Sequence, residues 1–143
     1  MRTLTVVALD ALEADIAGGS DEAALFAQAL EFLPHAALRR HVEARAYADA
    51  AILIHRTLMP AQGYYLGETA ARRGLATTWQ KDDAHTRPFE AATPGLALLR
   101  ASAHAAASHR RDRTRAACAI CGGLGWFITR EGRKRICGHG NVG

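Results

Sequence analysis

Residues 63–80 read GYYLGETAARRGLATTWQ, a segment in which aromatic and β-branched residues lie on both sides of a polar, glycine-containing turn. Aromatic and β-branched residues favour strands, whereas the residues between them favour a change of chain direction. The pattern predicts two antiparallel strands, residues 63–70 and 75–80, joined around Arg72-Arg73-Gly74. Because helical patterns precede and follow this hairpin, we expect an α+β fold.

Three helical segments are predicted before the hairpin. The first ends at Gly18-Gly19, a natural stop. The second begins at Ser20-Asp21-Glu22, where the serine can cap the helix, and ends at Pro34. The third extends from His35 to Met59 and is interrupted around Arg45. The apolar stripe expected on the first helix consists of Leu4, Val7, Ala8, Leu12 and Ile16.

After the hairpin, residues 81–87 form a polar loop, and one further helix is predicted. Thr93 supplies an N-cap and Pro94 a first helical residue, so this helix extends from Pro94 to about Ser108. Together with the end of the third helical segment, the hairpin and this helix form an αββα unit, residues about 47–107. Tyr64, Tyr65 and Trp79 belong to the core of the unit or form a stacking platform on the sheet.

All three cysteines lie in the last twenty-six residues, beside glycines and a histidine. Cys118-x-x-Cys121 and, sixteen residues later, Cys137-x-His139 have a spacing typical of zinc sites. A tetrahedral zinc ion takes four sulfur or nitrogen ligands, and these four residues supply them. Because one residue alone separates Cys137 from His139, His104 and His109 are alternatives for the fourth ligand. The sequence therefore predicts one structural zinc ion.

A second hairpin is predicted between the two ligand pairs. Trp126–Arg130 and Arg133–Ile136 are rich in aromatic and β-branched residues, and they flank Glu131-Gly132. A cysteine turn, a hairpin and a second ligand pair make a zinc ribbon. The segment resembles zinc ribbons and DnaJ-type knuckles, whose repeat is Cys-x-x-Cys-x-Gly-x-Gly, and it contains one such repeat.

Length and charge divide the chain into two parts. The 143 residues, with 49% hydrophobic and 22% charged residues, allow one globular domain, residues 1–110, and a basic zinc-ribbon module, residues 111–143. Residues 1–99 carry nine basic and twelve acidic residues, whereas residues 100–143 carry nine and two. A basic module suits DNA, RNA or an acidic protein surface. The binding residues predicted for it are Arg110, Arg111, Arg113, Arg115, Arg130, Arg133, Lys134 and Arg135.

The cellular location expected for the chain is the cytoplasm of a bacterial host. The apolar run from Leu4 to Leu9 is too short for a signal or membrane-spanning segment. An odd number of cysteines without a secretion signal indicates reduced thiols and metal binding rather than disulfides. No membrane partner is expected.

The αββα unit resembles a family of small phage and prophage proteins with an "ABA sandwich" layout. The residues that carry the resemblance are Tyr47–Ala51, Pro60 before Gly63-Tyr64-Tyr65, and above all Ala91–Ala101. The resemblance implies an accessory protein of a mobile element. The family has no assigned catalytic residues that could be transferred to this chain.

The cysteines partly match two kinds of zinc enzyme. His41-Val42-Glu43 with Cys118-x-x-Cys121 is similar to the pattern of zinc nucleobase deaminases, but Ala117 stands where those enzymes have proline. A hydrolytic zinc enzyme needs an open coordination position, which four protein ligands close. We therefore expect no enzymatic activity. His55, within an apolar helix, is expected to be a packed or surface histidine.

Two functions remain. In the first, the protein is a counter-defence inhibitor, similar to anti-CRISPR proteins, that binds a host nucleic-acid-binding nuclease such as a CRISPR effector. In the second, it is a phage gene regulator, similar to antitermination factors, that binds DNA or RNA through the basic module. Charge favours the second function, whereas the family resemblance and the lack of a base-reading element favour the first.

Overall fold

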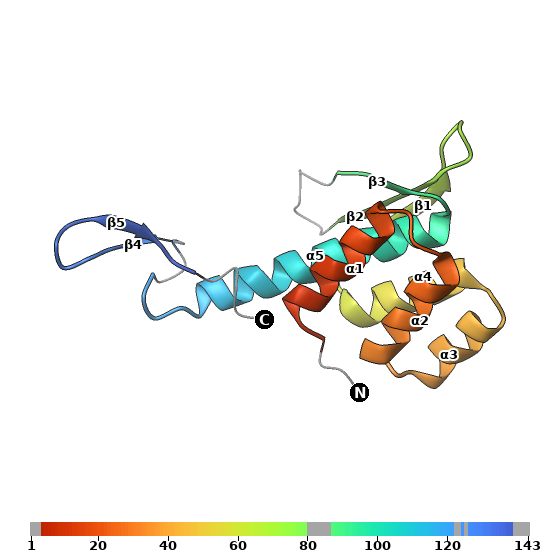
Figure 1. Ribbon diagram of the computed structural model, residues 1–143, viewed down its shortest axis with the longest axis horizontal. Helices are drawn as coiled ribbons and strands as arrows, with labels where there is room; N and C mark the ends of the chain where they lie inside the picture. Colours follow the sequence, from red (N-terminus) through yellow and green to blue (C-terminus); the bar gives the residue numbers. More distant parts are fainter. Residues whose placement is uncertain (1–3, 80–86, 122–123, 125, 139–143) are drawn as a thin grey trace.

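The computed structural model describes residues 4–79, 87–121, 124 and 126–138, and within them five helices combine with two small antiparallel sheets (Figure 1). This confirms a mixed helix and sheet fold. The helices are α1 (Val6–Ala17), α2 (Glu22–Phe32), α3 (Ala36–Glu43), α4 (Tyr47–Leu58) and α5 (Pro94–Ala116). The strands are β1 (Gly63–Glu68), β2 (Gly74–Trp79), β3 (Phe89–Ala91), β4 (Trp126–Ile128) and β5 (Lys134–Ile136).

Helix α5 is the central element of the body and contacts α1, α4 and all three strands of the larger sheet (Figure 1). Its first half is buried, and its second half projects from the body toward the β4–β5 hairpin. The expected end near Ser108 is wrong, because α5 continues for eight more residues to Ala116. The division expected at residue 110 therefore falls within a continuous helix. No helix in the described part of the chain is long and apolar enough to span a membrane.

The N-terminal helices begin at side-chain caps. Thr5 Oγ1 accepts the N–H of Ala8 at 3.1 Å, and Asp21, rather than the expected Ser20, accepts the N–H of Ala24 at 3.0 Å. The buried face of α1 agrees in part with the predicted one. Leu12 and Ile16 are buried and Leu4 packs against the core, as predicted, but Val7 is 62% exposed, and Val6 and Leu9 are buried instead of Val7 and Ala8. The buried residues of α1 are Val6, Leu9, Leu12 and Ile16.

The predicted interruption of the third helical segment is confirmed at Arg45. This residue has a left-handed φ of 56°, and the N–H of the following Ala46 donates to the carbonyl of His41 at 2.8 Å. The change of direction separates α3 from α4. It brings Tyr47, the first residue of α4, into a stacked contact with buried Phe26 of α2, with 5.0 Å between ring centroids.

The larger sheet has three strands rather than the predicted two. Strands β1 and β2 pair antiparallel, as expected, and β3 pairs with β2 so that Ala76 lies opposite Phe89. The three residues of β3 alternate buried, exposed, buried, a pattern too short to predict a strand from the sequence. The predicted polar loop at 81–87 lies mostly outside the described residues.

The aromatic residues of the β1–β2 hairpin divide between its two faces. Tyr64 lies on the helix-facing side and contacts the ring of His55 edge-on, with 5.1 Å between centroids. Tyr65 and Trp79 lie on the outer face and are 56% and 40% exposed. The Trp79 ring lies against Gly63, so closely that a methyl group at Gly63 would collide with it. Tyr64 is therefore a core residue, whereas Tyr65 and Trp79 are not.

His55 is a buried histidine with both ring nitrogens hydrogen-bonded. Nε2 lies 3.1 Å from the carbonyl oxygen of Gln62, and Nδ1 lies 3.0 Å from Ser102 Oγ. Because the carbonyl can only accept, Nε2 carries the proton, and Nδ1 accepts from the serine hydroxyl. Burial lowers the pKa of His55 below 6.5. Ser102 is also fully buried, so this pair links α4 to α5 and is closed to any substrate.

This arrangement predicts a loss of stability at low pH. His55 is neutral in the folded chain and, at acidic pH, takes up a proton on unfolding. Its contribution to the free energy of unfolding is therefore fully present above about pH 6.5 and is lost as the pH falls. His55→Gln should lower the free energy of unfolding by about 2 kcal/mol, because buried partners lose their hydrogen bonds, and should flatten the pH dependence. Denaturant unfolding between pH 5 and 8 checks this. His41→Gln on α3 is the control, and equal pH profiles for wild type and His55→Gln would contradict the assignment.

Candidate metal centre

The β4–β5 hairpin forms with the predicted turn. Trp126 pairs with Ile136 and Ile128 with Lys134. At the turn, the N–H of Thr129 donates to the carbonyl of Arg133 at 2.9 Å, and Gly132 adopts a left-handed φ of 76° that glycine takes without strain. The hairpin thus returns the chain to the end of α5, where the first two cysteines lie.

Three cysteine side chains meet at this point. Cys118 follows the C-cap of α5, Cys121 lies in the next turn, and Cys137 follows β5. Their sulfur atoms all lie within 4.8 Å of one another, and the Cys118 and Cys137 sulfurs are 3.7 Å apart. Two thiolates bound at 2.3 Å to one tetrahedral ion would lie about 3.8 Å apart. The cluster could therefore hold a metal ion.

The protonation of these thiols is unequal. The backbone N–H of Cys121 donates to Cys118 Sγ and lowers the pKa of the Cys118 thiol below its usual value. Burial and the neighbouring Cys118 and Cys121 thiols raise the pKa of Cys137 to about 11. Three sulfurs this close cannot all become thiolates unless a cation offsets their mutual repulsion. This is the behaviour of a set of metal ligands.

The structure brings together three of the four predicted metal ligands, and His139 lies outside the described residues. Neither alternative histidine belongs to the cluster. His104 Nδ1 lies 3.0 Å from Glu13 Oε2 of α1, and His109 lines a cleft that also includes Cys118. The deaminase-like His41 and Glu43 also lie outside the cluster among the residues described.

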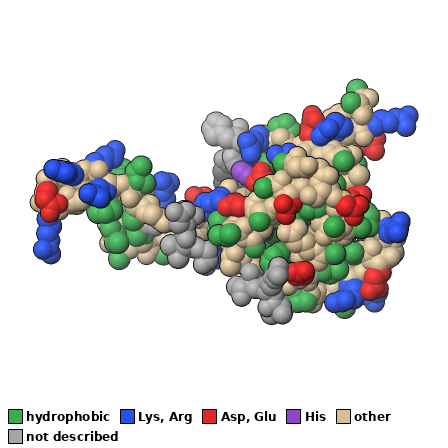
Figure 2. Space-filling model, in the orientation of Figure 1, with side chains coloured by type: hydrophobic (Ala, Val, Ile, Leu, Met, Phe, Trp, Pro, Cys, Tyr) green, Lys and Arg blue, Asp and Glu red, His purple; other side chains and the backbone are tan. Residues whose placement is uncertain are grey.

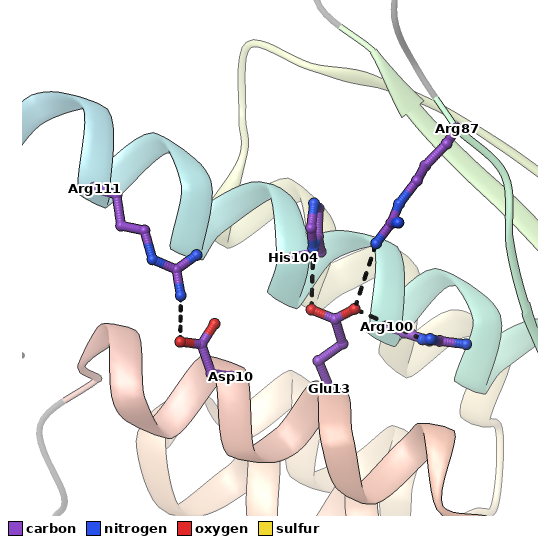
Figure 3. A network of polar contacts seen from close by, with 6 residues as sticks. All are labelled: Asp10, Glu13, Arg87, Arg100, His104 and Arg111. Carbon is purple, nitrogen blue, oxygen red and sulfur yellow. Dashed lines mark hydrogen bonds and ion pairs between the residues drawn. The ribbon is translucent and has the colours of Figure 1, made fainter. Parts of the chain in front are cut away.

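Two of the predicted binding arginines are used inside the molecule. Arg111 forms an ion pair with Asp10 of α1 (Figure 3), and Arg110 Nη1 donates to the carbonyl of Leu4 at 3.0 Å. These contacts hold the projecting half of α5 against the start of α1. Arg113 and Arg115, in contrast, are exposed on the last turns of α5.

The four basic residues of the second hairpin are all exposed. Arg130 and Arg133 lie at its turn, and Lys134 and Arg135 lie on β5. The Lys134 ammonium lies over the Trp126 ring, 4.4 Å from its centroid, and this cation–π contact fixes it on one face of the hairpin. The sequence predicted these cations but not this contact.

The same module exposes large aliphatic side chains, which the sequence analysis did not identify as a surface. Figure 2 shows apolar and basic side chains exposed together on this module. Ile128 and Ile136, on the face that carries Trp126, are 56% and 87% exposed. Ile120 and Leu124, in the cysteine turn, are 67% and 63% exposed. We call these four residues the apolar patch.

A polar network that the sequence did not predict joins α1, β3 and α5. Glu13 accepts from His104 and lies 3.8 Å from Arg100 Nε and 4.0 Å from Arg87 Nη2 (Figure 3). Arg87 also lies over the Phe89 ring, 4.7 Å from its centroid. The residues are 74 to 91 positions from Glu13 in sequence, so no local pattern could have paired them.

Comparisons of the chain with protein-family models, with curated proteins and with solved structures find no match. The resemblance of residues 47–107 to the phage ABA sandwich family therefore stays a prediction. Functional inference for this chain rests on the cysteine cluster, the basic residues and the apolar patch.

Proposed function

We propose that Cys118, Cys121 and Cys137 bind one structural zinc ion and, with His139 as fourth ligand, hold the C-terminal module as a zinc ribbon. The supporting observation is the sulfur geometry, in which the 3.7 Å separation matches the edge of a zinc–thiolate tetrahedron. The hairpin has two three-residue strands and needs such a support, since isolated two-stranded hairpins are marginally stable.

We propose further that the protein is a non-enzymatic accessory protein of a phage or mobile element, and that its ribbon binds a host nucleic-acid-binding nuclease as a counter-defence inhibitor. The apolar patch carries this proposal. Four exposed aliphatic side chains, on a module that also exposes Arg130, Arg133, Lys134 and Arg135, suit a protein surface that has both apolar and acidic residues. Phosphates would leave these aliphatic side chains in water.

The alternative is a phage gene regulator that binds DNA or RNA through the same hairpin. Its support is the concentration of positive charge, nine basic against two acidic residues in residues 100–143. In this case the basic residues would contact phosphates, and the affinity would fall steeply with salt.

The inhibitor is tested in a bacterial strain whose CRISPR effector targets an infecting phage. Expression of the wild-type chain should restore plaque formation, and the double change Ile128→Asp and Ile136→Asp should abolish this effect. Burying a charge in an apolar interface costs on the order of 2 kcal/mol or more, at least about thirtyfold in affinity. Val7→Asp is the matched control, because Val7 is an exposed aliphatic residue of the body.

The outcomes separate the two functions. If plaque formation is unaffected by the wild-type chain, the inhibitor proposal fails for that effector. The regulator gains support if the protein alone binds a labelled DNA or RNA oligonucleotide and if this binding requires Arg130, Arg133 and Arg135. Its affinity should also fall strongly between 50 and 200 mM salt, as expected for about six to ten phosphate contacts. Val7→Asp should leave both activities unchanged.

A further inference from the structure

A second basic surface lies between the end of α4 and the projecting half of α5, and we call it the α4–α5 cleft. Its volume is about 840 Å³, and Leu58 and Met59 from the end of α4 provide its apolar wall. The polar side of the cleft comes from α5 and the cysteine turn. It consists of His109, Arg110, Arg113, Thr114 and Cys118.

The polar residues share one face of α5. His109 and Arg113 are four residues apart, as are Arg110 and Thr114, so the side chains of each pair are neighbours on the helix surface. Arg110 uses one N–H for the carbonyl of Leu4, and a guanidinium has five such donors, so others remain. The cleft thus gathers two permanent positive charges and a histidine.

The cleft has the charge of an anion site. No carboxylate lines it among the residues that the structure describes. Arg111, between the two lining arginines, points instead to Asp10 of α1, where its charge is paired (Figure 3). Arg113 lines the cleft, and its side chain makes no ion pair or hydrogen bond with another residue that the structure describes, whereas Arg110 lines the cleft while one of its N–H groups donates to the carbonyl of Leu4.

We propose that the α4–α5 cleft binds a phosphate group, either in a small phosphate compound or in the backbone of a nucleic acid. Arginine forms paired, charge-assisted hydrogen bonds to phosphate oxygens. The Thr114 hydroxyl donates to the carbonyl of Arg110 at 2.9 Å, so the donors for a phosphate come from the arginines and His109. The apolar wall at Leu58 and Met59 would contact the carbon-rich part of such a ligand. This site is separate from the apolar patch and does not depend on the proposed host partner.

Two arginines of α5 provide a matched pair for the test. Arg113 lines the cleft, whereas Arg115, also exposed and two residues further along the same helix, does not. Arg113→Gln and Arg115→Gln remove the same charge. Binding of inorganic pyrophosphate is measured by calorimetry, and binding of a fluorescent single-stranded DNA by anisotropy, with the full metal-containing chain.

Arg113→Gln should weaken binding about tenfold or more, because it removes a charge-assisted contact, whereas Arg115→Gln should change it less than about twofold. Binding of pyrophosphate with this selectivity would identify small phosphate compounds as ligands, and selective binding of DNA alone would identify the nucleic-acid backbone. Equal loss in both variants, or no binding of either probe, would overturn the proposal. The protein with both Ile128→Asp and Ile136→Asp should bind the two probes as the wild type does. Failure of the proposed host interface on the hairpin can therefore be distinguished from failure of the phosphate site.

Discussion

Removal of the metal by a chelator is expected to unfold the chain beyond about Ala116 and to leave the helical body folded. The β4–β5 hairpin contacts the rest of the molecule little, and its two isoleucines, Ile128 and Ile136, are exposed, so it has almost no core. Binding of zinc to cysteine-rich sites contributes on the order of 10 kcal/mol to local folding. The body keeps its own core around α5.

Hydrogen–deuterium exchange measured by mass spectrometry checks this prediction. With chelator, peptides from residues 126–138 should exchange at the rate of an unfolded chain, whereas peptides from α1, α4 and the first half of α5 should remain protected. Cys137→Ser should reproduce the effect of the chelator, and Arg130→Gln, an exposed change in the same hairpin, should not. If the hairpin stays protected without metal, the metal does not hold the module.

Gly74→Ala should destabilise the body by about 3 kcal/mol or more, which lowers the melting temperature by roughly 10 °C. Gly74 is buried at the start of β2, opposite Ala91 of β3. A methyl group there would overlap the carbonyl of Thr93 and the nitrogen of Pro94, where α5 begins. Backbone atoms cannot turn aside as a flexible side chain can, so the strand or the helix must move.

Thermal unfolding compared with Gly18→Ala checks this prediction. Gly18, the C-cap of α1, has a φ of −73°, and its nearest potential contact is a carbonyl oxygen at 3.4 Å. Alanine fits there, so this control should change stability by less than about 1 kcal/mol. If the Gly74→Ala protein has the same melting temperature as the wild type, β2 and α5 are not packed this closely.

Local chemistry made much of the fold predictable. The Thr93 cap and Pro94 start of α5, the break at Arg45, the two hairpins and the cysteine turn each follow from a few neighbouring residues. These features depend on backbone conformation and capping, which act over about four residues. The grouping of the three cysteines was predictable because the β4–β5 hairpin, itself predicted from its turn and strands, returns Cys137 to Cys118.

The remaining features depend on tertiary contacts. The length of α5 follows from Arg110 and Arg111, which bind Leu4 and Asp10 about a hundred residues earlier in the chain. Strand β3 has three residues and exists because β2 is beside it. In the first turns of α1, packing on α5 decides that Val6 and Leu9 are buried rather than Val7 and Ala8, because helical spacing from Leu12 and Ile16 fits either pair.

The surfaces were the least predictable part of the candidate site. Tyr65 and Ile136 have strand-like neighbours and would usually be assigned to a core, yet both are exposed. Tyr65 lies on the outer face of the three-stranded sheet and Ile136 on the two-stranded β4–β5 hairpin, and both side chains remain exposed because their faces are not covered by a second layer in the described part of the chain. The exposure of such a side chain depends on whether another helix or strand packs on its face of the sheet. The local sequence of the strand does not determine this.

We propose that the cysteine cluster holds zinc, and native mass spectrometry of protein purified without added metal can determine whether it does. We expect one zinc ion per chain, lost in Cys118→Ser, Cys121→Ser and Cys137→Ser, reduced in His139→Ala and retained in His109→Ala. Folded protein that carries no metal, or zinc that survives loss of any cysteine, would contradict the claim.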